Sequence, residues 1–324
     1  MIIQSPNSAM PEPYYSYVRQ RSETIAKVLG SIVNGSNVQL CPRAITPDEL
    51  LYKGEDDILY GTLVHNFADG FKSVLYKNDF SETKRQGLFT NDTSVAKEYA
   101  TVLFREGNRA RIKNPLESDG KGQITIESMS EFDNVFEEIN STNQIGVVIM
   151  PHIAHINRRI SVGKIELGAV GTFMYLGLEE IQCYEGEMVY GGTTLGLFRE
   201  DNLQGYNQVQ DALRIPARLA NLGRDTLRAY QAMVMKIGRA SVVVIEGLTD
   251  NGSLLEDVVD ITPRVGGTTP AEVLAIREVY NCPEKVCFAK SQLLYNPDSS
   301  PLTGINFVDT PGLVINAQIL EVMG

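Results

Sequence analysis

The sequence PARLANLGRDTLRAYQAMVMKI, residues 216–237, carries the strongest structural signal in the chain. Pro216 suits the first turn of a helix, and Gly238 suits the position just after its end. At about 100° per residue, apolar side chains recur on one side of this helix and basic side chains recur on the other. The apolar residues are Ile215, Leu219, Leu222, Tyr230, Met233 and Ile237, and the basic residues are Arg214, Arg218, Arg224, Arg228, Lys236 and Arg239. This pattern predicts one long amphipathic helix that forms the spine of the fold.

Shorter strand and helix patterns lie on both sides of this helix. Glycines punctuate short β-branched and aromatic runs over residues 160–198, which is typical of a Gly-rich β-region with hairpin turns. Elsewhere, alternation or short apolar runs indicate strands, and helical spacing of apolar residues indicates helices. The strands are expected at 58–64, 123–127, 145–150, 241–246, 286–289 and 313–321, and the helices at 17–33, 93–105, 131–139 and 270–280. The sequence therefore predicts an α+β fold of mixed, mostly antiparallel short strands, with the Gly-rich β-region and the spine helix at 216–237.

Composition divides the chain into three predicted parts. Prolines and tyrosines crowd residues 6–17, which suits an extended arm better than a packed element. Pro42 and Pro47 mark a linker after the helix that follows this arm. We therefore expect an N-terminal arm and helix over residues 1–50, an α+β domain over 51–150, and a β-rich domain with the long helix over 151–324.

Charge and hydropathy restrict the classes of function. The 324 residues include 29 Lys and Arg against 40 Asp and Glu, a net charge of −11, which argues against nucleic-acid binding by bulk attraction. The N-terminus lacks the basic and apolar regions of a secretory signal, and no apolar run approaches the length of a membrane span. The four cysteines are too scattered for a disulfide scaffold or a four-cysteine zinc site. We expect a soluble protein that is made in a reducing cytoplasm and has no membrane contact.

Several short motifs have both a chemical and a structural interpretation. His152 and His155 have the spacing of zinc ligands, but no further ligand stands at a recognisable offset, so ordinary loop histidines are favoured. The string FVDTPG at 307–312 occurs in GTPases, but no G-x-x-x-x-G-K-[ST] loop accompanies it, which favours a Pro-Gly turn between strands. The Gly-Gly-Thr-Thr segments at 191–194 and 266–269 fit a phosphate cradle or, more often, a hairpin tip or a loop at a subunit contact.

The chain shows no complete catalytic or metal-binding constellation. Its three histidines are accompanied by no G-x-S-x-G nucleophile motif, and the C-x-x-C redox motif is also missing. The sequence therefore predicts that the protein is not an enzyme, and it indicates no cofactor and no metal.

Short motifs follow one another in order between residues 58 and 150. They are ILYGT (58–62), GLFTND (87–92), AKEYA (96–100), IKNPL (112–116) and GVVI (146–149). Together they resemble the ADP-ribosyltransferase-like modules of large phage and plasmid polyproteins. The resemblance implies that Tyr99 stacks on nicotinamide and that Glu127 is a candidate for the acidic residue, whereas Tyr60 stands where the family has a histidine that holds the nicotinamide ribose. It therefore implies either an ADP-ribosyltransferase-like enzyme or an inactive relative.

The general character of the chain resembles a tailed-phage virion structural protein. The features that it shares are the Pro/Tyr arm, a spine helix, Gly-rich hairpins and the lack of tryptophan. The resemblance implies a self-assembling subunit of a virion, such as a capsid, tail or connector protein, whose partners are copies of itself, other virion proteins and, at a basic surface, packaged DNA. In the arm, Tyr14, Tyr15 and Tyr17 would lie across a neighbouring subunit. On the helix, Arg214, Arg218, Arg224 and Arg228 would face solvent, an acidic neighbour or DNA.

Overall fold

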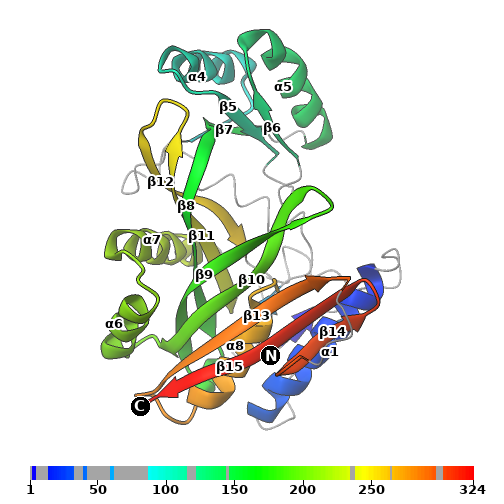
Figure 1. Cartoon of the computed structure of the whole chain (residues 1–324), viewed down its shortest axis with the longest axis vertical. Helices are drawn as coiled ribbons and strands as arrows, with labels where there is room; N and C mark the ends of the chain where they lie inside the picture. The colour runs from blue at the N-terminus through cyan, green and yellow to red at the C-terminus, as the bar shows by residue number, and fades with distance from the viewer. Residues whose placement is uncertain are drawn as a thin grey trace. The chain divides into compact units, whose positions relative to one another are not determined.

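A mostly antiparallel sheet of eight strands makes up the larger part of the structure, which is a computed structural model (Figure 1). The spatial order of its strands is β12-β11-β8-β9-β10-β13-β15-β14. Their bounds are β8 Ile153–Glu166, β9 Thr172–Tyr184, β10 Glu187–Arg199, β11 Arg239–Thr249, β12 Leu254–Thr262, β13 Val286–Tyr295, β14 Ile305–Thr310 and β15 Leu313–Met323. Most neighbours in the sheet are also close in sequence, so most connections are short.

The structure describes residues 2–4, 14–32, 39–41, 59–61, 87–114, 122–143, 146–233, 238–262, 265–296 and 302–324. Two units make up the chain, and each is assembled from separate stretches of sequence. The first unit comprises Met1–Val64, Ile160–Val242 and Thr262–Gly324, and the second comprises His65–Arg159 and Val243–Ile261. Within the described residues, no helix is both long and apolar enough to cross a membrane.

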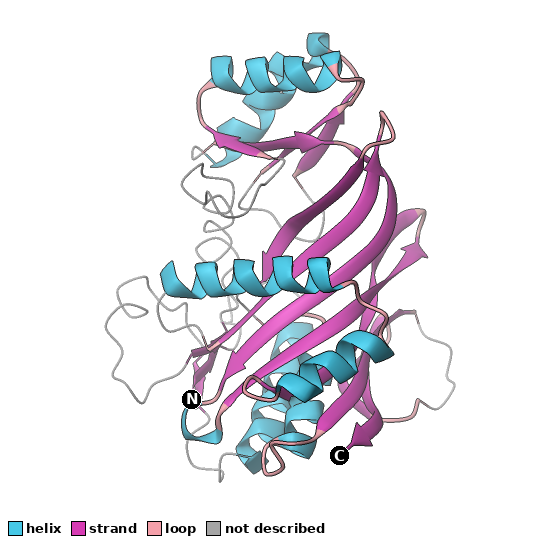
Figure 2. Cartoon of the chain, turned by 90° about the vertical axis from the view of Figure 1, so that its left-hand side faces the viewer, coloured by secondary structure: helices cyan, strands magenta, loops and turns pink. Residues whose placement is uncertain are grey.

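Helices cover both faces of the sheet in the first unit. Helices α1 (Tyr14–Ile32) and α8 (Thr269–Val279) share an apolar core with Leu195 and Leu197 of β10. Because side chains alternate across a strand, the residues between and after these two point to the opposite face. There a Cβ at Gly196 would meet Val209 of α6 (Leu203–Ala212) at 2.6 Å, and the ring of Phe198 meets Tyr206 of α6 edge-on. Helix α7 (Ala217–Met233) crosses the same face (Figure 2).

A buried ion pair ties helix α8 to the start of strand β11. The Arg239 and Glu272 side chains are 1% and 0% exposed. The Arg239 guanidinium donates hydrogen bonds to both Glu272 carboxylate oxygens, from Nε to Oε2 at 3.0 Å and from Nη2 to Oε1. Its Nη1 donates to the Thr262 carbonyl at 2.8 Å. Each charge therefore has its opposite, as burial of a charge requires.

The second unit contains a four-stranded antiparallel sheet that carries two helices. The spatial order of its strands is β4-β7-β5-β6. Figure 1 shows both helices on one side of this sheet. The elements are β4 Leu88–Thr90, α4 Thr93–Arg105, β5 Ala110–Lys113, β6 Gln123–Ile126, α5 Met129–Asn143 and β7 Val147–Pro151. Asp92 caps α4 by accepting hydrogen bonds from the amides of Ser94 and Val95, so the helix starts where the sequence predicts.

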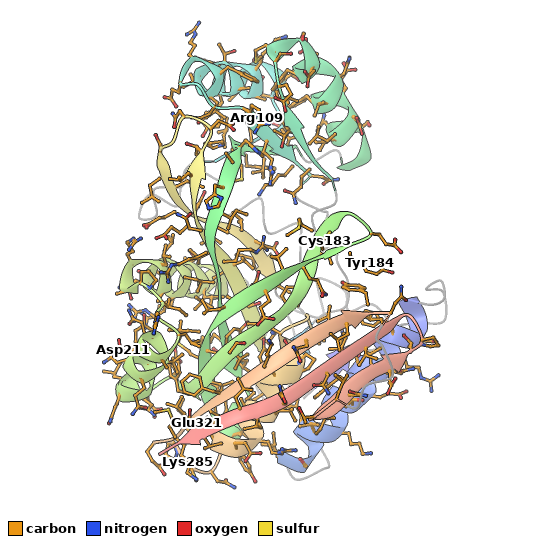
Figure 3. All side chains as sticks on the ribbon, in the orientation of Figure 1. Arg109, Cys183, Tyr184, Asp211, Lys285 and Glu321 are labelled. Atoms are coloured by element: carbon orange, nitrogen blue, oxygen red, sulfur yellow. The ribbon has the colours of Figure 1, made fainter. Side chains whose placement is uncertain are left out.

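A cluster of polar side chains holds the β11–β12 turn against the start of β5. Arg109 donates to the Asp250 carboxylate from its backbone amide and from Nη2, both at 2.9 Å, and to Glu127 at 2.9 Å (Figure 3). The Asn251 backbone amide donates to the Oδ1 atom of Asn108 at 3.2 Å. The Arg109 hydrogen bonds hold the pKa of Asp250 below its usual value. This cluster fixes the strand that carries the site described below.

A small parallel sheet and a short helical turn complete the described elements. The sheet has the order β2-β1-β3, with bounds β1 Ile2–Gln4, β2 Gln39–Cys41 and β3 Leu59–Gly61, and the turn is η2, Gly168–Val170. Both belong to the first unit.

The predicted α+β class and the predominance of antiparallel strands are confirmed. Residues 160–198, however, form parts of three long strands, each of 13 or 14 residues, rather than a run of short ones. Helix α7 spans 17 residues and α1 spans 19, so 216–237 is not the single long helix of the fold; residues 234–237 lie outside the described part. Helix α8, unlike α7, is buried on all sides over its first two turns. The ion pair between Glu272 and Arg239 holds α8 in position.

The predicted extended arm overlaps helix α1. Tyr14, Tyr15 and Tyr17 lie in the first turn of α1, and residues 5–13 are outside the described part. The helix begins directly after Pro13, the last of the three prolines within residues 6–17. Four of the residues assigned to the arm, 14–17, are therefore helical.

The two Gly-Gly pairs, at 191–192 and 266–267, lie in different structural surroundings. Gly191 and Gly192 lie inside β10 at a β-bulge and not at a hairpin tip. Gly192 has a φ of 146°, and a Cβ there would come within 2.1 Å of the Ser291 carbonyl oxygen, so only glycine fits this close approach of β13. Gly266 and Gly267 come just before α8, where a Cβ at Gly267 would meet the Tyr190 ring at 2.3 Å. Close packing therefore accounts for the glycines at 192 and 267, and a subunit contact at either pair stays a prediction.

The FVDTPG string forms the turn that the sequence favours. Strands β14 and β15 pair antiparallel on either side of Pro311 and Gly312, with Thr310 opposite Leu313. The Leu313 amide donates to the Thr310 hydroxyl at 3.2 Å, which closes the turn. The resemblance to the GTPase motif is therefore a coincidence of turn residues.

Removal of one charge from the buried ion pair should destabilise the first unit. We expect Glu272→Gln to lower the free energy of unfolding by about 3–5 kcal/mol, because the Arg239 charge stays buried without its counter-ion. The double variant Arg239→Met/Glu272→Leu should lose less than Glu272→Gln, since it leaves no unpaired charge. Urea denaturation followed by circular dichroism measures both. A Glu272→Gln protein within 1 kcal/mol of the unmodified chain would contradict this role of the pair.

The Asp250 cluster should give the second unit a stability that depends on pH. The folded pKa of Asp250 is lowered, so its contribution is complete above the unfolded value of about 4 and is lost as the pH falls through the folded value. Because solvent screens this carboxylate, we expect Asp250→Asn to cost at most about 1 kcal/mol at pH 7 and less at pH 3. The matched control is Asp133→Asn, which removes only an exposed pair with Lys97. Urea denaturation at both pH values tests this, and equal losses for Asp250→Asn at pH 7 and pH 3 would refute it.

Candidate functional site

Strand β5 places two cationic side chains on the sheet face that lies opposite helices α4 and α5. Ala110 and Ile112 are fully buried in the core beneath the two helices. Because side chains of a strand alternate between faces, Arg111 and Lys113 must project from the other face. Both are half-buried. Their positions are fixed by hydrogen-bonded strands on both sides, β6 and β7.

The neighbours of these two cations are set by the strand register. On β6, Thr125 stands opposite Arg111 and Gln123 stands opposite Lys113. On β7, Met150 lies opposite Arg111, and it is buried against Val243, Ile245 and Leu255 in a separate apolar cluster. One end of this face is therefore closed by apolar packing, whereas polar and cationic side chains line the rest.

His152 joins Arg111 and Thr125 in a closed hydrogen-bonded group. The His152 Nδ1 atom lies 3.2 Å from Arg111 Nη2 and 3.4 Å from Thr125 Oγ1, and Arg111 Nε donates to the same hydroxyl at 3.4 Å. Burial and the Arg111 and Arg109 charges lower the pKa of His152. Burial and the Arg109 charge also lower the pKa of Arg111, which nevertheless remains a cation because guanidinium groups do not deprotonate in proteins.

The connection that leaves β5 has a sequence suited to contact with an anion. The Asn114 amide donates to the Gly122 carbonyl at 2.7 Å, so the two ends of the connection are close together. Gly122 has a φ of 62°, and Gly120 and Lys121 precede it in the sequence. Glycines allow backbone amides to approach phosphate oxygens closely. Arg111 and Lys113, on the strand that precedes this connection, form a candidate anion-binding site.

Of the residues that the transferase resemblance singled out, Tyr99 lies on the other side of the sheet from Arg111. Tyr99 is half-buried on α4 and packs against the core between the helices and the sheet, whereas Arg111 projects from the opposite sheet face. Burial, together with the Asp257 and Glu106 charges, raises the pKa of Tyr99 to about 12. Glu127 is occupied in its ion pair with Arg109. The side chain of Tyr60 is outside the described part.

The two histidines of the zinc interpretation have separate surroundings. His152 lies between β7 and β8 within the hydrogen-bonded group described above, and His155 is an exposed residue of β8. In the part of the chain that the structure describes, no three or more His, Cys, Asp or Glu side chains form a group that could hold a metal ion.

The residues predicted to form a subunit interface lie in α1 and around α7. The Tyr17 hydroxyl accepts a hydrogen bond from Arg21 at 2.8 Å, whereas the side chains of Tyr14 and Tyr15 are outside the described part. Arg224 stacks on the Tyr206 ring at 5.4 Å. The three remaining predicted residues are exposed, and they are Arg214, Arg218 and Arg228. Their role as an interface stays a prediction.

Sequence reasoning missed Arg111, Lys113 and Thr125 as candidate functional residues. Their signal was the alternation Ala-Arg-Ile-Lys at 110–113, directly before Asn-Pro and a glycine-containing connection. Such an alternation is also typical of an ordinary strand with one solvated face. Only the pairing of β5 with β6 and β7 brings these side chains together with His152.

Comparison with solved structures shows the fold of this chain. N5-carboxyaminoimidazole synthetase from Staphylococcus aureus, complexed with ADP, is similar with a TM-score of 0.53 and 13% identity, over 98% of this chain and 86% of that chain. Biotin carboxylase from Campylobacter jejuni, in a complex with β,γ-ATP, is similar with a TM-score of 0.53 and 8% identity, over 98% of this chain and 87% of that chain. Both are enzymes of the ATP-grasp fold, and the chain shares that fold.

These likenesses correct the predicted function. The prediction of a self-assembling phage virion subunit, whether capsid, tail or connector protein, is wrong, because the fold is that of ATP-grasp enzymes. The prediction that the protein is not an enzyme is contradicted by the same fold. An amphipathic helix and glycine-rich strands are common to enzymes and shell proteins, so they could not distinguish the two classes. The resemblance of residues 58–150 to ADP-ribosyltransferase-like modules is tested by neither likeness and stays a prediction.

Comparison with family models is more specific about this chain. No curated protein matches its sequence. One family model matches residues 78–304, a range that contains the four-stranded sheet and most of the eight-stranded sheet. Because this match covers more than half of the sequence, the chain belongs to the family described as "Protein of unknown function (DUF3182)".

Proposed function

We propose that this protein is an ATP-dependent enzyme that holds the phosphates of the nucleotide on Arg111 and Lys113. The observation that carries the proposal is the placement of two cations, Arg111 and Lys113, on one face of the four-stranded sheet. The two similar enzymes, one complexed with ADP and the other with β,γ-ATP, support the choice of nucleotide. They are a synthetase and a carboxylase, which favours reactions that join two molecules at the expense of ATP.

The geometry of β5 suits a polyphosphate better than a single anion. Residues two apart on a strand lie about 7 Å from each other, so the long side chains of Arg111 and Lys113 can reach different phosphate groups of one nucleotide. The guanidinium group of arginine offers several donors in a plane, whereas lysine offers a compact charge. One residue can therefore bind two oxygens of one phosphate while the other neutralises its neighbour.

A magnesium ion bound together with the nucleotide would need few ligands from the protein. Magnesium that binds together with a nucleotide needs only one or two protein carboxylates, because the phosphates and water supply its other ligands. No group of three or more candidate ligands exists in the described ranges, so these residues offer no site that would hold the ion without the nucleotide.

Replacement of Lys113 should weaken ATP binding directly. We expect Lys113→Met to raise the dissociation constant of ATP by about 10- to 100-fold, because one charge-assisted contact is lost. Lys97→Met is the matched control, since Lys97 is on α4 and pairs with Asp133 at 2.7 Å. Isothermal titration calorimetry on the full chain measures both, and circular dichroism checks that each variant is folded.

Two results would contradict the proposed function. The first is a failure of the unmodified protein to bind ATP at millimolar concentration. The second is an equal change of ATP affinity in Lys113→Met and Lys97→Met, because only one of these lysines projects from the proposed face.

A further inference from the structure

We propose that His152 is a positioning residue that orients Arg111 toward the nucleotide phosphates, and that it does so as a neutral imidazole. The inference rests on the proposed function of this sheet face, and it adds a residue and a condition for binding. The starting observation is the closed group of His152, Arg111 and Thr125, in which each member lies within 3.4 Å of the other two.

The backbone fixes the imidazole of His152 in place. The His152 amide donates to the Arg109 carbonyl at 2.8 Å, which extends the pairing of β7 and β5 by one residue. Arg109 is itself held by Asp250 and Glu127. The ring therefore approaches Arg111 from an anchored position, and not from a loose loop.

The hydrogen bonds determine which nitrogen of His152 carries the proton. A guanidinium group can only donate, so the Nδ1 atom that faces Arg111 Nη2 must be an acceptor. The proton of the neutral ring is then on Nε2. A second proton on Nδ1 would remove this acceptor and place two like charges about 3 Å apart.

The charges around His152 favour the neutral form. Arg111 and Arg109 oppose protonation, whereas the Asp250 and Glu127 carboxylates promote it. Burial is the largest cause that favours the neutral ring, ahead of the two arginines, and the net result is a pKa below that of an unperturbed histidine. At neutral pH the imidazole is therefore available as the acceptor that holds Arg111.

His152 should strengthen nucleotide binding because it restricts the conformations of the Arg111 side chain. Without His152, the Arg111 guanidinium keeps only Thr125 as a side-chain partner within this group and samples more conformations. An ordered guanidinium loses less entropy when it binds a phosphate. Protonation of His152 should act in the same direction as its removal, so ATP binding should weaken as the pH falls.

Variants at position 152 separate the acceptor from the titration. Asparagine places a carbonyl oxygen close to the position of Nδ1 and does not titrate, whereas alanine removes the acceptor. At pH 8 we expect His152→Ala to raise the dissociation constant of ATP about three- to tenfold and His152→Asn to leave it nearly unchanged. His155→Ala is the matched control, because that histidine is exposed on β8.

The pH profile is measured as a ratio, because ATP itself gains a proton near pH 6 to 7. The ratio of the dissociation constants of the unmodified protein and of His152→Asn should be near one at pH 8. It should rise as the pH falls, by up to tenfold per pH unit once the imidazole is protonated. A ratio that stays constant across the pH at which nitrogen NMR shows His152 gaining its second proton would overturn the inference.

Two further measurements make the outcome unambiguous. In an Arg111→Met background, His152→Ala should no longer change ATP affinity, since His152 acts through Arg111; an undiminished effect would overturn the proposed role. Nitrogen NMR of the histidines in the nucleotide-free protein should show a proton on Nε2 of His152, and a proton on Nδ1 would overturn the inference without reference to ATP. Failure of the unmodified chain to bind ATP while the NMR result holds would count against the proposed function alone.

Discussion

The alternation of side chains along β5 is the constraint on which the functional site depends. Ala110 and Ile112 are buried beneath α4 and α5, and this burial forces Arg111 and Lys113 onto the opposite face of the sheet. A shift of one residue in the register would exchange the two sets and place both charges in an apolar core, at a cost that the unit could not sustain. The same apolar packing that stabilises the unit therefore orients its cations.

In each unit an ion pair holds one element in place, which is helix α8 in the first unit and the β11–β12 turn in the second. In the first unit, Glu272 anchors the buried helix α8 to Arg239 at the start of β11. In the second, Asp250 anchors the β11–β12 turn to Arg109, directly before β5. Ion pairs are directional and fail when one partner is displaced, so they specify a single arrangement where apolar packing would tolerate several. This precision suits a site in which Arg111, Thr125 and His152 must meet within hydrogen-bonding distance.

Local patterns predicted much of the secondary structure and little of the site. Helix α4 was predicted at its observed bounds, because its apolar spacing is a local signal. The burial of α8 depends on Arg239, which is 33 residues away from Glu272, and no local pattern reveals it. Local patterns do not reveal the site either, because Arg111 and His152 are 41 residues apart and meet only through the β5–β7 pairing. Function was misjudged because a search for short motifs cannot find a site assembled in this way.

Amide hydrogen–deuterium exchange with and without saturating ATP tests most directly whether the nucleotide lies on this sheet face. The account predicts slower exchange in peptides that cover β5, β6 and the junction at His152, with no change in α6 on the eight-stranded sheet. Protection confined to peptides outside the second unit, or no protection under conditions where ATP is bound, would contradict it.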